Sequence, residues 1–338
     1  MQTVKFRRAI NQALDEEMSR DNKVFLMGED IGASGGTFGL TKGLMDKYGD
    51  MRVKDTPISE EAIMGTVLGA SLVGYRPIFD LMFMDFIMIA MDQLVNQASK
   101  THYLSGGKIK APLVVRALAG GGFRAGGHHS QTLESWFTHV PGLKVVYPST
   151  PYDAKGLLKA AIRDDNPVLF LEHKSLLSIQ QEIPEEEYII PLGKADVKRQ
   201  GSDITIVAFG RMVHTALEAA EKLAELGIEA EVVDPRTLLP LDKDTILASV
   251  RKTNKVIIVH EAPKNSGFGS EIAAVISEEA IYDLDGPIIR IGGVFSTIPV
   301  GSIEDNLYPK VGEVVEEAKK LISKQEINKK SEVKVYDS

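Results

Sequence analysis

Residues 203–233 read DITIVAFGRMVHTALEAAEKLAELGIEAEVV, and this stretch decides the fold class. A β-rich run at 203–209 is followed by a helical pattern at 213–226, which Gly227 stops, and then by a second β-rich run at 229–233. This alternation is typical of a parallel sheet covered by helices. We therefore predict an α/β domain in this part of the chain.

The same alternation extends in both directions and predicts two α/β domains. The stretch 174–200 interrupts it, because it has few apolar positions and no clear period. We expect a first domain over 1–185, a linker over 186–200 and a second domain over 201–338. The predicted strands outside the first stretch are Val24–Met27, Ile78–Leu81, Leu113–Ala117, Val145–Tyr147, Val168–Leu171, 255–260 and 287–291. The predicted helices are 59–74, 84–104, 242–252, 268–280 and 311–323.

Composition restricts the classes of partner. The 338 residues are 43% hydrophobic and 25% charged, which is ordinary for a globular protein. A net charge of -8 without a basic stripe argues against nucleic acid and against an anionic membrane as partners. The absence of cysteine excludes disulfides, thiolate catalysis and cysteine-ligated metals. No cleavable signal is recognisable, so we expect a cytoplasmic protein or the mature form of an organellar matrix enzyme, with a charged tail at 324–338 that is solvated or docks elsewhere.

A glycine-rich loop is the first candidate for chemistry. Residues 119–127 read AGGGFRAGG and lead directly into His128, His129, Ser130 and Gln131. Glycines allow a ligand to approach the backbone, and histidine supplies a proton donor near pH 7. The spacing matches neither a Walker loop nor a dinucleotide fingerprint, and no nucleophile elbow surrounds Ser130. A strained surface loop with exposed histidines therefore remains an equal alternative at this point.

Two adjacent acids at a predicted helix start form the second candidate. Ser59 is a plausible N-cap, and Glu60 with Glu61 would lie in the first turn, where the helix dipole favours acids. That structural role is favoured on local sequence. A functional role would require one of them to be buried against a ligand. The helix also carries small residues on one face, for which we expect close packing against another backbone: Gly65, Gly69, Ala70 and Gly74.

Other polar groups give weaker signals. The turn Arg163–Pro167 collects carbonyl oxygens that are able to hold a hard cation, although a simple turn explains its residues equally well. His260 and Glu261 follow a predicted strand, and we assign them no role. The remaining histidines are isolated and show no metal-ligand spacing. Composition and spacing alone thus support an α/β enzyme or enzyme subunit of unknown reaction.

Several longer segments resemble one protein family in the same order along the chain. They are 55–60 (DTPISE), 74–78 (GYRPI), 91–98 (MDQLVNQA), 129–131 (HSQ), 141–146 (PGLKVV), 153–158 (DAKGLL) and 234–240 (DPRTLLP). Together they resemble the β subunit of thiamine-diphosphate-dependent 2-oxo acid dehydrogenases (E1), over about residues 3–324. The resemblance implies a pyrimidine-binding domain followed by a transketolase C-terminal-type domain.

This resemblance implies roles for individual residues. Glu60 matches the glutamate that hydrogen-bonds N1′ of the aminopyrimidine, where a shared proton stabilises the imino tautomer that deprotonates the thiazolium C2. Phe86 matches an aromatic residue that packs on the pyrimidine, and Glu29 matches an acid near the cofactor. His129 matches the histidine associated with acyl transfer to lipoamide. His128 stands where the family commonly has a different residue, and its role stays open.

The metal requirements follow from the same resemblance. A monovalent-cation site, holding K⁺, would use the backbone carbonyls of Leu113, Ala161, Asp164 and Asn166. Thiamine enzymes hold Mg²⁺ and the diphosphate with a Gly-Asp-Gly motif, and this chain has none. The resemblance therefore implies that a separate E1 α subunit holds Mg²⁺ and that an α2β2 heterotetramer is the active enzyme.

The substrate is left among three alternatives. The leading hypothesis is a pyruvate dehydrogenase-type E1 β subunit, which decarboxylates a 2-oxo acid oxidatively and passes the acyl group to a lipoyl E2 acyltransferase. Ile89 stands where some pyruvate-type chains carry glutamine, and Phe123-Arg124 is unusual in the glycine-rich loop. Residues 80–83 (DLMF) with 89–93 (IAMDQ) resemble acetoin dehydrogenases more than branched-chain enzymes, so acetoin cleavage is the main alternative. A branched-chain 2-oxo acid is less favoured. Two hypotheses come from other functional classes. The missing diphosphate motif argues against a single-chain transketolase-like synthase, and the retained Glu60 and His129 argue against a non-catalytic scaffold.

Overall fold

The computed structural model describes residues 1–336, and it describes side chains for residues 1–323. The chain divides into two compact units. The first consists of Met1–Lys194, Arg236–Pro240 and Ile298–Glu304, and the second of Ala195–Pro235, Leu241–Thr297 and the residues from Asp305 onward. The chain first passes from one unit to the other between Lys194 and Ala195.

A seven-stranded sheet forms the centre of the first unit. Its strands are parallel except for the antiparallel edge strand β12. Buried Val, Ile, Leu and Phe side chains dominate the central strands, as expected for a parallel sheet covered on both faces. The five strands predicted here are confirmed. In order across the sheet the strands are β12 (Thr237–Leu239), β6 (Lys144–Val146), β7 (Val168–His173), β5 (Val114–Ala119), β4 (Arg76–Phe83), β2 (Val24–Gly28) and β3 (Val53–Asp55).

Helices cover this sheet and complete its core. Helix α1 (Phe6–Arg20) packs against α6 (Pro151–Arg163), and Ile10 and Leu14 of α1 share one buried cluster with Leu157 of α6. Pro151 starts α6 and Thr150 caps it by accepting from the Asp153 N–H. The other helical segments of this unit are η1 (Thr37–Gly39), α2 (Leu44–Tyr48), α3 (Glu60–Leu72), η2 (Met84–Met88), the π-helix η3 (Asp92–Ala98), α4 (Ser99–Leu104), α5 (Glu134–Thr138) and η4 (Lys174–Leu176).

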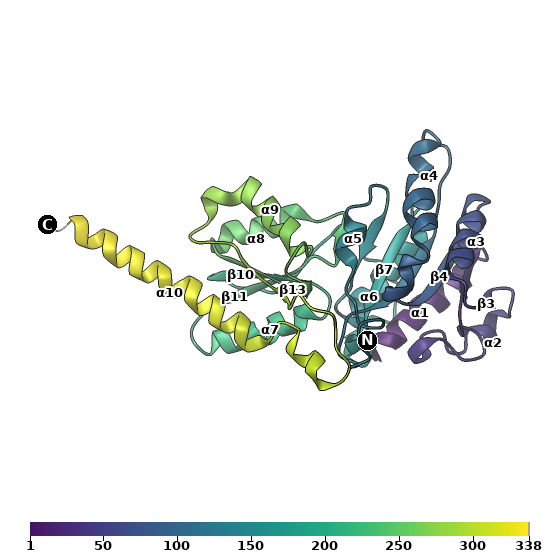
Figure 1. Cartoon of the computed structure of the whole chain (residues 1–338), viewed down its shortest axis with the longest axis horizontal. Helices are drawn as coiled ribbons and strands as arrows, with labels where there is room; N and C mark the ends of the chain where they lie inside the picture. The colour runs from purple at the N-terminus through teal and green to yellow at the C-terminus, as the bar shows by residue number, and fades with distance from the viewer. Residues whose placement is uncertain (337–338) are drawn as a thin grey trace. The chain divides into compact units, whose positions relative to one another are not determined.

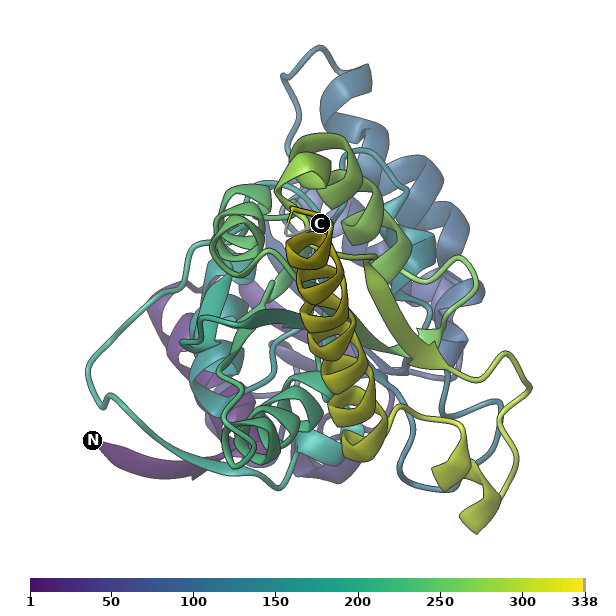
Figure 2. The same cartoon turned by 90° about the vertical axis from the view of Figure 1, so that its left-hand side faces the viewer.

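The second unit contains a five-stranded sheet, parallel except for the edge strand β9. Figures 1 and 2 show α8 and α9 on one side of this sheet and α7 on the other, where α10 packs against α7. All the strands and helices predicted here are confirmed. In sheet order the strands are β14 (Ile289–Gly293), β13 (Val256–Pro263), β10 (Ile204–Ala208), β11 (Ala230–Asp234) and β9 (Asp196–Arg199). The helical segments are α7 (Met212–Ala224), α8 (Lys243–Thr253), α9 (Gly269–Ala280), η5 (Ile281–Asp283) and α10 (Val311–Tyr336), and η6 (Ser302–Asn306) is shared by the two units.

The structure differs from the sequence predictions at several places, and β3, β12 and α6 are elements that were not predicted. The stretch 174–200 contains two strands, because β8 (Gln180–Ile183) pairs antiparallel with β1 (Gln2–Lys5) and β9 pairs antiparallel with β11. The helix expected over 84–104 is broken into η2, η3 and α4. Among the described residues, a Cβ at Gly69 of α3 would meet nothing within 4 Å and one at Gly65 would meet only the Gln93 side chain at 3.8 Å, so the expected close approach of another backbone is not seen at these two glycines. Helix α10 continues through Tyr336, and the proposed solvation of the tail concerns side chains outside the described residues.

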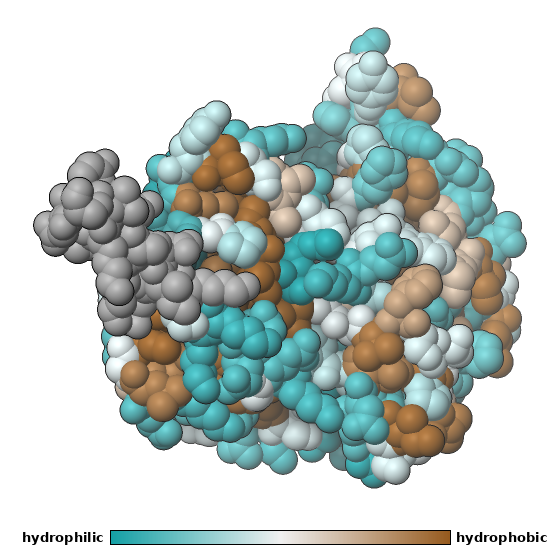
Figure 3. Space-filling model, turned by 60° about the vertical axis from the view of Figure 1, so that its left-hand side comes forward, coloured by the Kyte–Doolittle hydropathy of each residue, from teal (hydrophilic) through white to brown (hydrophobic). Residues whose placement is uncertain are grey.

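Within the described residues, no helix combines the length and the apolar character needed to cross a membrane. On the face that Figure 3 shows, hydrophobic side chains lie in several separate patches among hydrophilic ones.

Candidate functional site

Four neighbouring parallel strands of the first unit end at one edge of the sheet, and both predicted and unpredicted residues of the candidate site lie at or just after their ends. Glu29 follows β2, Phe83 ends β4, the glycine-rich loop follows β5, and Lys174 follows β7. The carboxyl ends of parallel strands are where open α/β sheets bind their ligands. The fold therefore brings residues far apart in sequence to one edge.

Two carboxylates lie close together at this edge. Glu60 is the first residue of α3 and is 7% exposed. Burial raises the pKa of Glu29, and the negative charges of Glu60 and Asp30 raise it further. Ser59 occupies the N-cap position, but its hydroxyl does not cap the helix. Its backbone N–H instead donates to the Glu29 carboxylate. This hydrogen bond joins the start of α3, which carries Glu60, to the segment that carries Glu29.

An aromatic cluster surrounds the imidazole of His129. The ring centroid of Phe83 lies 5.1 Å from that of His129, and the centroid of Phe86 lies 5.7 Å from it, both edge-to-face. The two phenylalanine rings are themselves 5.9 Å apart in the same arrangement. All three residues are half-buried. The structure thus brings together two of the predicted site residues, Phe86 and His129, although 43 positions separate them in sequence.

Two charged residues that sequence reasoning missed hold the segment around His129. The Lys174 ammonium donates to the backbone carbonyl of His129 and lies 5.2 Å from the centroid of the Phe83 ring. The Asp85 carboxylate accepts from the backbone N–H of Gln131 at 3.2 Å and from its side-chain amide at 2.9 Å. Lys174 directly follows the observed strand β7, but it lies three residues beyond the predicted strand Val168–Leu171, and no sequence signal pointed to it.

The glycine-rich loop itself follows a path that needs glycine. Gly120, Gly122 and Gly126 all have positive φ angles, and a Cβ at Gly126 would lie 2.8 Å from a methyl group of Val300. The segment 298–304 of the same unit anchors the loop, because Glu304 accepts from the backbone N–H of Gly122 at 2.5 Å. The loop is therefore a defined element, and the alternative of a strained surface loop with exposed histidines fits its positive φ angles and His128 but not the half-buried His129.

A buried ion network lies beneath the site. The Arg116 guanidinium on β5 donates to both carboxylate oxygens of Glu172 on β7, at 2.7 and 3.0 Å, and to Asp80 on β4 at 3.0 Å. Asp80 also accepts from the N–H of Met82, whose φ of 65° marks an irregularity in the strand just before Phe83. Burial raises the pKa of Glu172, the charge of Asp80 raises it further, and Arg116 opposes both.

The carbonyls proposed as ligands of a monovalent cation come from the last turn of α6, the turn that follows it, and the residue before β5. The Leu113 carbonyl accepts from the N–H of Val168 at 3.0 Å, and that of Ala161 accepts from the N–H of Asp164 at 3.2 Å. The Asp164 carbonyl accepts from the guanidinium of Arg76 at 2.9 Å. Among the described residues, no group of three or more His, Asp or Glu side chains is arranged to hold a metal ion. A cation here would therefore depend on backbone oxygens that also accept hydrogen bonds.

Three further polar residues of the sequence analysis stay outside this arrangement. Glu61 is exposed and contacts only the Gln93 amide, at 3.4 Å. His128 is exposed, in contrast to its neighbour His129. His260 belongs to the second unit, where its ring stacks on Phe209 at 5.9 Å, and burial lowers its pKa to about 4.

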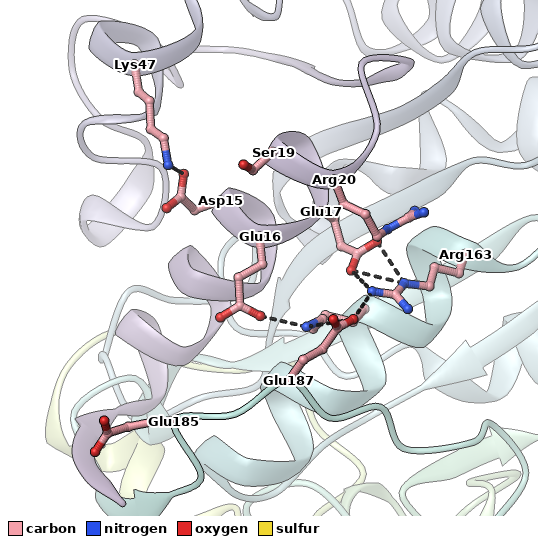
Figure 4. A pocket seen from close by; sticks show the side chains of 10 residues that line it. Asp15, Glu16, Glu17, Ser19, Arg20, Lys47, Arg163, Glu185 and Glu187 are labelled. Atoms are coloured by element: carbon pink, nitrogen blue, oxygen red, sulfur yellow. Dashed lines mark hydrogen bonds and ion pairs between the residues drawn. The ribbon is translucent and has the colours of Figure 1, made fainter.

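A charged cavity elsewhere in the first unit does not contain the predicted residues. It has a volume of about 420 Å³ and lies beside α1 and α6 (Figure 4). Its charged groups pair with one another: Arg163 with Glu17, and Lys159 with Glu16 at 2.6 Å. We assign no ligand to this cavity because its charges are mutually compensated.

Each of the two units contains a region that matches a known protein family. Residues 2–180 match the family described as the transketolase, pyrimidine binding domain. Residues 193–314 match the transketolase, C-terminal domain. Among solved structures, the chain is similar to one titled "Split gene transketolase, inactive beta4 tetramer", with a TM-score of 0.77 and 26% identity over 95% of this chain and 98% of that chain.

Characterised relatives from three enzymes show comparable identity. The chain is 51% identical to the 2-oxoisovalerate dehydrogenase subunit beta of Bacillus subtilis, over 87% of this chain and 90% of the relative. It is 47% identical to the acetoin:2,6-dichlorophenolindophenol oxidoreductase subunit beta of Cupriavidus necator, over 93% and 96%. It is 46% identical to the pyruvate dehydrogenase E1 component subunit beta of Bacillus subtilis, over 93% and 97%.

Proposed function

The chain belongs to the family of E1 β subunits of 2-oxo acid and acetoin dehydrogenases, and we propose that it forms, with an α subunit, an enzyme that oxidatively decarboxylates a 2-oxo acid. The observation that carries this proposal is the buried Glu60 beside Glu29, at the sheet edge that also holds Phe86 and His129. Both acids and both rings lie within the unit that matches the pyrimidine-binding domain.

The residues at this edge fit the aminopyrimidine half of thiamine diphosphate. In the described structure the Glu60 carboxylate has no side-chain hydrogen-bond donor, and one buried oxygen of Asp85 has no hydrogen-bond partner. Unsatisfied buried acceptors are costly and suit a ligand that brings N–H groups. When bound, the cofactor supplies the nucleophilic carbon that attacks the substrate carbonyl.

Four residues of the site then have separate roles in the proposed reaction. Glu60 shares a proton with N1′ of the aminopyrimidine, and its largely buried side chain suits that role. Glu29 supports that proton, since burial raises its own pKa and the negative charges of Glu60 and Asp30 raise it further. Phe86 provides an apolar surface for the ring. His129 is placed beside Phe86 to serve transfer of the acyl group to the lipoyl domain of an E2 acyltransferase.

We assign the Mg²⁺ and the diphosphate to the α subunit. Gly-Asp-Gly is absent from the 338 residues. The open space at Gly69 of α3 supports the proposal of a chain that completes its packing in an assembly such as α2β2, because a surface helix gains nothing from interior glycines. K⁺ is proposed at the turn after α6, where each carbonyl keeps a second lone pair beside its hydrogen bond.

The test is co-expression with a candidate α chain, followed by assay with pyruvate, a branched-chain 2-oxo acid and acetoin. We expect pyruvate to give the highest kcat/KM. Acetoin is the second candidate because residues 80–83 resemble acetoin enzymes, and the similar identities to the three relatives do not separate the substrates. A higher value with acetoin or the branched-chain acid would replace pyruvate. An assembled α/β enzyme inactive on all three would contradict the proposed reaction class.

A further inference from the structure

Lys174 is a buried cation whose role the proposed function leaves unexplained. It begins η4 directly after β7 and is only 2% exposed. A buried ammonium is unfavourable unless it is hydrogen-bonded or paired. A methionine of similar length would fill the same space without that cost. The residue type therefore points to a task that needs a positive hydrogen-bond donor.

Two contacts of Lys174 lead to His129. Its ammonium donates to the His129 carbonyl, and it lies 5.2 Å from the centroid of the same Phe83 ring that touches the imidazole edge-to-face at 5.1 Å. One side chain thus contacts both the backbone that carries the imidazole and one of the rings that confine it.

A second charged residue holds the other flank of the segment. Asp85, 5% exposed, accepts two hydrogen bonds from Gln131, two positions beyond His129. This segment directly follows the glycine-rich loop, in which Gly120, Gly122 and Gly126 have positive φ and glycine gives the backbone high conformational freedom. Such a loop loses much entropy when it is ordered, and charge-assisted hydrogen bonds are the strongest local means of offsetting that loss.

We propose that Lys174 is a positioning residue for His129, acting with Asp85 as a two-sided clamp on the segment 129–131. This proposal rests on the proposed function, because it gives Lys174 a role only through the step assigned to His129. Lys174 is not expected to touch the substrate. Its loss should therefore affect transfer to the lipoyl group far more than the steps that precede it.

The experiment compares two electron acceptors in the assembled α/β enzyme. Turnover is measured with a lipoyl domain, which requires acyl transfer, and with the dye 2,6-dichlorophenolindophenol, which does not. For Lys174→Met we expect the ratio of lipoyl-coupled to dye-coupled turnover to fall on the order of tenfold to a hundredfold, the range for losing a hydrogen bond to a charged group. Amides of residues 126–131 should also exchange hydrogen faster.

Lys159→Met is the matched control. Lys159 is a lysine of the same unit, 1% exposed and paired with Glu16 on α1. This variant tests whether the loss of any buried lysine is sufficient to lower the ratio of lipoyl-coupled to dye-coupled turnover. We expect lower stability in this variant and an unchanged ratio of the two turnovers. If Lys174→Met does not assemble, Lys174→Gln replaces it, with a fall in the ratio again expected.

His129→Ala in the same assays separates the two levels of inference. If His129→Ala leaves the ratio unchanged, the role of His129 in the proposed function is wrong. If His129→Ala lowers the ratio but the Lys174 variants change neither the ratio nor the amide exchange, the positioning role of Lys174 is wrong. An equal fall of the turnover ratio in Lys159→Met would also overturn the positioning role, because the fall would then reflect a general loss of stability.

Discussion

Replacing Arg116 by methionine tests whether the first unit depends on its buried ion network. The variant removes the cation that pairs with Glu172 at 2.7 and 3.0 Å and with Asp80 at 3.0 Å. The side chains of the two acids are 1% and 6% exposed, so water cannot replace the guanidinium. Breaking a buried ion pair by removing one partner costs about 3–5 kcal/mol, a large part of the stability of an ordinary domain.

Urea unfolding of the full chain measures this loss. The single tryptophan, Trp136, lies in the first unit, so its fluorescence reports on that unit. With a typical urea dependence, the expected loss moves the midpoint down by about 1 to 2 M at pH 7.

The stability lost in Arg116→Met should become smaller as the pH falls. In the native chain burial already raises the pKa of Glu172 above its unfolded value, and removal of Arg116 takes away the opposing positive charge. The folded state then binds more protons than the unfolded state in the window above the unfolded pKa of about 4.3. Stability therefore falls as pH rises through that window, and lowering the pH toward 5 should restore part of the lost midpoint.

A neutral version of the network is the control. Arg116→Met combined with Asp80→Asn and Glu172→Gln leaves no uncompensated charge, and it should recover at least half of the loss at pH 7. The reasoning is refuted if the triple variant is as unstable as Arg116→Met, or if the loss of stability does not depend on pH. Lost packing, rather than an uncompensated buried charge, would then explain the lower stability.

Three further predictions concern the cofactor, the two histidines and the cation. Calorimetry of the chain alone should show no tight, Mg²⁺-dependent binding of thiamine diphosphate, and micromolar binding without the α subunit would contradict the shared site. In the assembled enzyme, His129→Ala should lower lipoamide-coupled turnover on the order of 10²-fold while exposed His128→Ala lowers it much less, and equal losses would assign the effect to the loop. Replacing K⁺ by choline should lower the thermal midpoint, with an unaltered midpoint arguing against a site at Leu113, Ala161, Asp164 and Asn166.

Much of the fold could be predicted from the sequence because its central strands are continuous apolar runs and its longer helices are periodic. The missed strands are short edge strands such as β9, 196–199, and β12, 237–239, whose pairing is antiparallel and with distant segments. Local patterns do not record such pairing. The helix expected over 84–104 fails for a related reason, because Phe83 to Met88 turns toward His129 rather than continuing a regular period.

The candidate site was predictable only in part. Local sequence favoured a structural role for Glu60, and the roles of Glu60, Phe86 and His129 came from the family resemblance. Lys174 and Asp85 were missed because their contacts join residues 45 and 46 positions apart. No local signal distinguishes such a lysine from one in solvent, and only the fold reveals that it is buried.

The most direct test of the account is the exchange rate of the C2 proton of thiamine diphosphate bound to the assembled enzyme, followed by NMR in Glu60→Gln and Glu61→Gln. Both variants remove one acid from the first turn of α3, but Glu60 is buried and Glu61 is exposed. If Glu60 shares the N1′ proton, Glu60→Gln should slow exchange by about 10²-fold or more while the heterotetramer still assembles, and Glu61→Gln should leave exchange almost unchanged. Exchange at the native rate in Glu60→Gln would contradict the account, and slowed exchange in Glu61→Gln alone would transfer the role to Glu61.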